Sequence, residues 1–136
     1  VKDNHSTEAG RIDKPIAGLL RDLKQRGMLD DTLVLFTTEF GRTPFAQSSS
    51  DKVGPGRDHN KYGFSCWLAG GGVKAGFGFG QTDEIGWKTV ENPVQWHDFW
   101  ATMLHLIEEA HKKLNFSQNG IERSLTKVHV ANGIFA

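Results

Sequence analysis

The run TLVLFTT at residues 32–38 constrains the fold of this chain most strongly. Its apolar and β-branched residues predict a strand buried on both faces, as in a parallel sheet. It follows an amphipathic segment, residues 11–31, whose apolar residues recur at helical spacing: Ile12, Ile16, Leu19, Leu20 and Leu23. A helix, a short turn and a buried strand make up half of an α/β repeat. We therefore expect an α/β fold.

Local signals suggest where the helices begin and end. Asp13 is a candidate N-cap, Pro15 suits the first turn, and Gly27 suits the C-terminal stop. A second helix is expected over residues 92–114, with Asn92 as its cap and Pro93 at its first position. The apolar residues of that segment run nearly all round, which predicts a helix packed inside a core.

The remaining segments are expected to be one strand, two loops and a tail. FSCWLAG at residues 64–70 predicts a second buried strand, and the polar residues 40–62 predict a long functional loop. The glycine-rich residues 70–80 predict turns, without the Gly-Lys-Ser/Thr of a phosphate-binding loop. Residues 114–136 form a weakly patterned tail. The whole chain, 1–136, is expected to be a single segment.

Charge and composition narrow the partners. Sixteen basic residues balance sixteen acidic ones, so no net field favours nucleic acid or a membrane surface, and neither is expected as a partner. No apolar run reaches the roughly 18 residues of a transmembrane helix. The single cysteine, Cys66, is expected to be a small buried hydrophobe. The opening VKDNHSTEAG suggests a segment cut from a longer chain.

Ligand-type side chains gather after the first expected strand. Glu39 follows the strand end, where open α/β sheets bind ligands, and it is either a ligand or a loop carboxylate paired with Arg42. The motif GRDH adds Arg57, Asp58 and His59. Histidine and carboxylates suit divalent cations, and either arginine could hold an oxyanion with its forked donors.

A further pair of candidate ligands lies at the start of the chain. Asp3 and His5 would share a face if their segment were extended. No nucleophile signature accompanies these residues, because the sequence lacks a Gly-x-Ser-x-Gly elbow.

Five ordered segments together resemble one family. They are DNHS at 3–6, the stretch 18–44 ending in TTEFGRTP, GRDHNKYGFSCWLAGGGVKAG at 56–76, GQTDEIG at 80–86 and HDFWATMLHLI at 97–107. This set resembles the C-terminal part of the domain-of-unknown-function family 1501, whose proteins are sulfatase-like members of the alkaline phosphatase superfamily. The likeness runs from about Asp3 to Thr126.

The resemblance implies a fold and an activity. It implies a doubly wound α/β sheet with flanking helices, of which this chain would be the last third. Members of the superfamily hydrolyse sulfate or phosphate esters with one or two divalent ions, here of the Zn, Ca or Mg type. The implied metal ligands are Asp3, His5, Glu39, Asp58 and His59, and the implied contacts to the ester are Arg42, Arg57 and Asn60.

The sequence also departs from the family pattern. Phe40 stands where the superfamily has a histidine for its second metal, and phenylalanine cannot bind a cation. Lys2 and Trp100 replace a tryptophan and a histidine of close relatives. The nucleophile and the first metal-binding aspartate of the superfamily lie N-terminal to any residue present here.

Three hypotheses follow. The first is a part of a metal-dependent hydrolase of sulfate or phosphate esters, inactive as this isolated chain, whose substrate is an anionic small-molecule or glycan ester. The second is a non-catalytic anion- or glycan-binding module of the same fold. The third is a structural chain that needs the missing N-terminal part or self-association to cover apolar surface. Relatives often carry export signals, which suits a periplasmic or secreted address.

Overall fold

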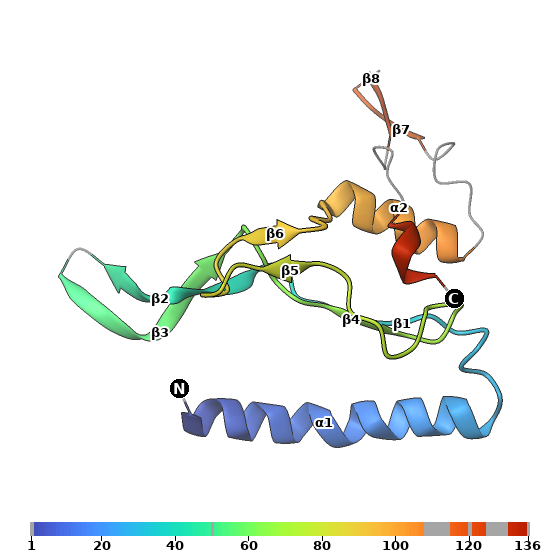
Figure 1. The fold of residues 1–136 in the computed structure, drawn as a ribbon, viewed down its shortest axis with the longest axis horizontal. Helices are drawn as coiled ribbons and strands as arrows, with labels where there is room; N and C mark the ends of the chain where they lie inside the picture. The colour runs from blue at the N-terminus through green and yellow to red at the C-terminus, as the bar shows by residue number, and fades with distance from the viewer. Residues whose placement is uncertain (1, 50, 108–114, 120, 125–130, 136) are drawn as a thin grey trace.

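The computed structural model describes residues 2–49, 51–107, 115–119, 121–124 and 131–135. These residues form a mixed α/β structure with two α-helices and small antiparallel sheets (Figure 1). The helices are α1 (Lys2–Gln25) and α2 (Trp96–Leu106), and a short 3-10 helix, η2, covers Asn132–Ile134. The strand pairs are β1 (Val34–Phe36) with β4 (Trp67–Ala69), β2 (Gly41–Ser49) with β3 (Lys52–Asn60), β5 (Gln81–Thr82) with β6 (Thr89–Glu91), and β7 (Asn115–Gln118) with β8 (Ile121–Ser124).

Helix α1 starts earlier than the sequence predicts and ends where expected. Because the helix begins at Lys2, Asp13 is not its cap and Pro15 lies inside it. Pro15 is exposed, so the carbonyl that loses its intrahelical partner can bond to water. Gly27 adopts a φ of 68°, and the Met28 N–H donates to the Leu23 carbonyl at 2.9 Å. That left-handed residue confirms Gly27 as the stop.

Strand β1 is shorter and more exposed than the predicted buried strand. It pairs antiparallel with β4, with Leu35 opposite Leu68. Phe36 stacks on Trp67 with ring centroids 5.4 Å apart, and both rings remain partly exposed. The prediction of a strand buried in a parallel sheet is wrong for the described residues, because β1 has one antiparallel neighbour there. The doubly wound architecture is not confirmed.

The expected loop at residues 40–62 is a β-hairpin. Strand β2 pairs antiparallel with β3, so that Arg42 lies opposite His59 and Ser49 lies opposite Lys52. The register shifts between Arg42 and Ala46, the stretch that contains Pro44. Proline cannot donate to a ladder and is tolerated at such irregularities. The prediction failed because the backbone ladder, and not apolar burial, holds these two polar strands together.

Helix α2 begins later than predicted. Its N-cap is Gln95, and Asn92 adopts a φ of 44°, so Asn92 and Pro93 belong to the preceding turn. The buried residues of α2 are the consecutive Ala101, Thr102 and Met103, whereas Trp96 and Trp100 remain exposed. The expectation of a helix buried all round is therefore wrong.

The C-terminal segment returns to the body of the chain. The Thr102 hydroxyl donates to the Asp98 carbonyl at 2.7 Å and accepts the Ala131 N–H at 3.0 Å. Phe135 forms a bridge with Val73. Part of the expected tail is thus the β7–β8 hairpin and η2, while residues 108–114 and 125–130 lie outside the described residues.

The chain leaves much apolar surface exposed. Its accessible surface is 10591 Å², whereas a compact protein of 15.1 kDa exposes roughly 7,100 Å². Among the described apolar residues, Leu23, Ala101 and Met103 are buried. Figure 1 shows α1 as a long helix below the strands, and Ile12 and Leu19 on the predicted apolar face of α1 are exposed. Neither described helix is long and apolar enough to cross a membrane.

Candidate anion-binding groove

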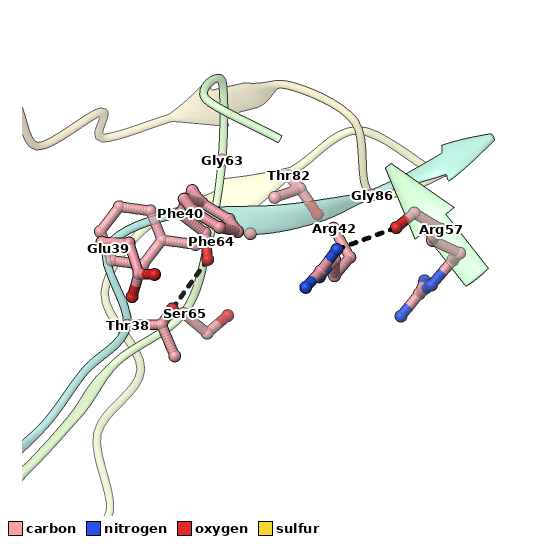
Figure 2. A pocket seen from close by; sticks show the side chains of 11 residues that line it. Thr38, Glu39, Phe40, Arg42, Arg57, Gly63, Phe64, Ser65, Thr82 and Gly86 are labelled. Atoms are coloured by element: carbon pink, nitrogen blue, oxygen red, sulfur yellow. Dashed lines mark hydrogen bonds between the residues drawn. The ribbon is translucent and has the colours of Figure 1, made fainter. Parts of the chain in front are cut away.

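An open groove of about 510 Å³ lies where the β2–β3 hairpin meets the loops around β5 (Figure 2). Its lining comes from five parts of the chain: the turn after β1, the start of β2, the middle of β3, the segment after β3, and the β5–β6 region. The lining residues are Thr38, Glu39, Phe40, Gly41, Arg42, Arg57, Gly63, Phe64, Ser65, Thr82 and Gly86. Three of the predicted site residues, Glu39, Arg42 and Arg57, are therefore brought together.

The two arginines carry the positive charge of the groove. An Nη1–H of Arg42 donates to the Arg57 carbonyl at 3.1 Å, so the hairpin backbone holds that guanidinium in place (Figure 2). Both residues are exposed. The ion pairs found among the described residues are Arg11–Glu8 and Arg26–Asp22, both on or beside α1. The charges of Arg42 and Arg57 are thus not neutralised by a carboxylate of the described residues, which suits an anionic ligand.

Glu39 lies at the opposite end of the groove from Arg57, with Arg42 between them (Figure 2). The Thr38 hydroxyl donates to the Phe40 carbonyl at 2.8 Å and so shapes the turn that presents Glu39. Because Glu39 follows the end of β1, the sequence placed it correctly near a strand end. The groove therefore offers an acceptor at one end and cations at the other.

Phe40 links the groove to His59. The two rings stack with centroids 3.9 Å apart and planes at 26°, and the Arg42 Cζ lies 5.5 Å from the Phe40 centroid. His59 itself is not among the lining residues. The Asp58 Oδ1 accepts the His59 backbone N–H at 2.7 Å, so part of that carboxylate serves its own strand.

Asn60 is buried next to the groove wall and bonds to its backbone. Its side chain is buried, with 1% of the residue exposed. Its Nδ2 donates to the Trp87 carbonyl at 2.8 Å and to the Gly86 carbonyl at 3.5 Å, and its Oδ1 accepts the Tyr62 N–H at 2.9 Å. These bonds tie the end of β3 to the turn before β6. Asn60 is expected from the resemblance to contact the ester, but here its amide is engaged with the backbone.

The turn that Asn60 holds is closed by Asp83. Its Oδ1 accepts the Trp87 N–H at 2.7 Å and its Oδ2 accepts the Lys88 N–H at 3.0 Å. The pKa of the Asp83 carboxyl is lowered, mainly because its carboxylate accepts the hydrogen bond from the Trp87 N–H. Desolvation opposes this effect, and the hydrogen bond from the Lys88 N–H adds to it. Neither this clamp nor the part of the groove wall formed by Gly63, Thr82 and Gly86 was predicted from the sequence.

In the groove wall, the backbone at Gly41 lies close to the backbone at Gly63. A Cβ on Gly41 would collide with the Gly63 carbonyl and come within 3.0 Å of the Phe64 Cβ. Glycine at position 41 therefore allows the start of β2 to approach the segment after β3.

The N-terminal candidates do not reach the groove. Residues 3 and 5 lie on α1, where positions two apart do not share a face, so the expectation of an extended segment is wrong. The side chain of Asp3 lies outside the described side chains, and His5 is exposed on the helix. The described residues contain no group of three or more His, Cys, Asp or Glu side chains able to hold a metal ion.

Cys66 lies just outside the groove wall. It is a free and exposed thiol, and not the buried residue that its apolar neighbours predict. Strand β4 begins at Trp67, so Cys66 belongs to the connecting segment. Partial burial still raises the pKa of the Cys66 thiol. A thiol of this kind is a poor nucleophile at neutral pH.

The chain was compared with protein families, curated proteins and solved structures. The family model described as Protein of unknown function (DUF1501) matches residues 1–135. No curated protein and no solved structure matches the chain significantly.

Proposed function

The chain belongs to the DUF1501 family, and from this membership and the groove we propose that it forms the anion-binding part of a hydrolase of sulfate or phosphate esters. In this proposal the fold is the C-terminal part of a doubly wound, alkaline-phosphatase-like sheet. The nucleophile comes from a polypeptide outside these residues, so the isolated chain is inactive. The substrate is an anionic small-molecule or glycan ester.

The observation that carries the proposal is the pair of arginines in the groove. Arg42 and Arg57 both line it, and neither has a carboxylate partner among the described residues. A guanidinium offers five donors in a planar fork that matches the oxygens of sulfate or phosphate. The bond from Arg42 to the Arg57 carbonyl uses one donor and leaves the others for a ligand.

Glu39 gives the groove a negatively charged end opposite the arginines. An ester whose anionic group lies between Arg42 and Arg57 would extend its alcohol part toward Phe40, Phe64 and Glu39. The two aromatic residues offer apolar contact to that part, while the carboxylate can accept a hydrogen bond from a hydroxyl group. These residues would bind and orient the ester.

A divalent ion fits these residues incompletely. Glu39 neighbours Phe40 in the chain and His59 stacks on the ring of Phe40, so this region offers two ligands. A catalytic site of the zinc type uses three protein ligands. A bound ion would act as a Lewis acid on an ester oxygen. Neither Asp58 nor His5 joins Glu39 and His59 in a group of ligand-type side chains among the described residues, so further ligands must come from elsewhere.

A second candidate function is a non-catalytic anion- or glycan-binding module of the same fold. Phe40 favours it, because the side chain that stacks on His59 is a phenyl ring, which has no lone pair to offer a cation. This candidate needs no metal and predicts binding without turnover in the longer protein.

Isothermal titration of the purified chain with inorganic sulfate and phosphate tests the shared part of both candidates. We expect saturable binding that Arg42→Ala or Arg57→Ala weakens at least tenfold, since each removes a charge-assisted contact. Arg21→Ala, an exposed position on α1, is the matched control and should bind as the wild type does. Equal binding by all four proteins would overturn the groove as the anion site.

Metal analysis separates the two candidates. The longer protein, which would supply the further ligands, and its His59→Ala variant are dialysed and measured by plasma mass spectrometry, and both are assayed with aryl sulfate and aryl phosphate esters. Stoichiometric metal that disappears in the variant, together with turnover, supports the hydrolase. Metal-free protein without turnover in the longer polypeptide supports the binding module.

A further inference from the structure

A cluster of aromatic and lysine side chains borders the groove, and the function proposed above does not use it. The rings of Phe45 and Trp87 lie 5.3 Å apart at 86°, and those of Tyr62 and Trp87 lie 6.4 Å apart at 84°. Phe45 is 52% exposed and Tyr62 is 51% exposed. We call these three residues, with Lys61 and Lys88, the aromatic–lysine platform.

The platform adjoins the groove through the chain itself. Tyr62 precedes Gly63 and Trp87 follows Gly86, and both glycines line the groove. Phe45 lies on β2, three residues after Arg42. A ligand longer than a single ester group would therefore meet the platform as it leaves the groove.

Two ammonium groups lie over the rings. The Lys88 Nζ is 4.8 Å from the Trp87 ring centroid and 5.8 Å from that of Tyr62, and the Lys61 Nζ is 5.1 Å from Tyr62. These cation–π contacts hold the ammonium groups at the surface. Neither lysine forms an ion pair among the described residues, so both charges can bind an anionic group.

The backbone beneath the platform is preorganised. The buried Asn60 bonds to the Tyr62 N–H and to the Trp87 carbonyl, and Asp83 bonds to the N–H groups of Trp87 and Lys88. Because this backbone is already held in place, these residues lose little conformational entropy when a ligand binds, which makes binding more favourable.

The ring geometry favours one class of ligand. A flat nucleic-acid base binds best on a face that is open or between parallel rings. Here Phe45 and Tyr62 each stand nearly perpendicular to Trp87, and lysines lie over the rings of Tyr62 and Trp87. A sugar ring instead offers polarised C–H groups to an exposed aromatic face such as that of Phe45. Its acidic substituent can reach an ammonium group at the same time.

We propose that the aromatic–lysine platform is a second subsite, which binds a sugar ring carrying an acidic substituent, so that the ligand of the groove is an anionic oligosaccharide. This inference rests on the proposed anion-binding groove and extends it. It predicts that affinity rises with ligand length, because groove and platform are occupied together.

The test compares four probes by isothermal titration: inorganic sulfate, chemically sulfated cellotetraose, neutral cellotetraose and a short single-stranded DNA. We expect sulfated cellotetraose to bind at least tenfold more tightly than inorganic sulfate, neutral cellotetraose or the DNA. Lys88→Gln and Phe45→Ala should each weaken the sulfated tetrasaccharide about fivefold to tenfold, and change the affinity for sulfate less than twofold.

The matched controls are Lys74→Gln and Phe77→Ala. Lys74 lies 4.9 Å from the Phe77 ring centroid, which reproduces the cation–π contact away from the groove. Lys88→Gln retains the Lys88 backbone bond to Asp83, so the turn should keep its fold. Control variants that lose as much affinity as the platform variants would overturn the inference.

The remaining outcomes separate this inference from the proposed function. Sulfate binding that depends on Arg42, with no gain for the tetrasaccharide, overturns the platform and leaves the groove standing. Tetrasaccharide binding that depends on Lys88 but not on Arg42, with no binding of sulfate, overturns the groove and with it the extended ligand. DNA binding as tight as that of the sulfated sugar overturns the saccharide assignment.

Discussion

The ring of Phe40 stacks on the imidazole of His59, with centroids 3.9 Å apart. These residues belong to different segments, one in the turn before β2 and the other in β3. The contact brings a residue that cannot bind metal against one that can. Glu39, a second ligand-type residue, directly precedes Phe40 in the chain.

Exchange of Phe40 for a ligand should therefore create a metal site. We expect Phe40→His to raise the affinity for Zn²⁺ at least tenfold over the wild type, because a new imidazole would join Glu39 and His59. Titration calorimetry measures the affinity of each variant for Zn²⁺. The Phe40→Leu variant and the double variant Phe40→His/His59→Ala should both lose the gain. Unchanged Zn²⁺ affinity in Phe40→His would show that these three positions cannot share an ion.

Removal of the Asn60 amide should loosen the groove wall. Asn60→Ala leaves the Tyr62 N–H and the Trp87 carbonyl without their partner in a buried place, which should cost about 1–3 kcal/mol. Faster hydrogen exchange at Tyr62, measured by NMR, would report the opening. The control Gln47→Ala changes an exposed side chain on β2 and should leave these rates unchanged. Equal rates in wild type and Asn60→Ala would contradict the assigned role.

The turn closed by Asp83 should resist acid. Because the folded-state pKa of Asp83 is lowered, its contribution to stability is present above the unfolded value of about 3.9 and is lost as pH falls through the lower folded value. Exchange protection of the Trp87 amide should thus be retained down to about pH 4 and decline below it. Asp83→Asn should remove this pH dependence. Loss of protection already at pH 5 in the wild type would refute the lowered pKa.

The thiol of Cys66 should be accessible but slow to react. Because it is exposed and partial burial raises its pKa, we expect complete labelling by a maleimide in native buffer at high pH. The rate at pH 7 should fall below that of free cysteine. Mass spectrometry follows the reaction, with a urea-treated sample as the control. Labelling that occurs only in urea would restore the buried thiol that the sequence predicted.

The exposed apolar surface should drive association of the isolated chain. Ile12 and Leu19 are 47% and 50% exposed on α1, and contiguous apolar surface of this kind promotes contacts between chains. We expect the apparent mass in sedimentation velocity to rise with concentration, and Leu19→Glu to reduce that rise. A monodisperse monomer with a cooperative melting transition would contradict this expectation.

Local signals in the sequence determined part of this structure. The helical periodicity within residues 11–31, the stop at Gly27 and the turn-forming glycines act over a few residues, and they appear in the structure, although the helix begins at Lys2 and not near Asp13. Glu39 likewise follows a strand end. Arg42 and Arg57 were both predicted as candidates to bind an oxyanion, and both line the groove.

Tertiary structure decided which residues from distant segments of the chain lie against one another. The pairing of Arg42 with His59, the burial of Asn60 beneath Trp87, and the meeting of Gly41 with Gly63 join segments distant in the chain. The sequence also predicted a buried strand at residues 32–38, yet β1 is short and partly exposed. Hydrophobic pattern reports which side chains favour burial, but the elements that cover them decide whether burial occurs. Hydrogen-bond ladders between polar strands leave no such pattern, so the hairpin and its groove emerge only in three dimensions.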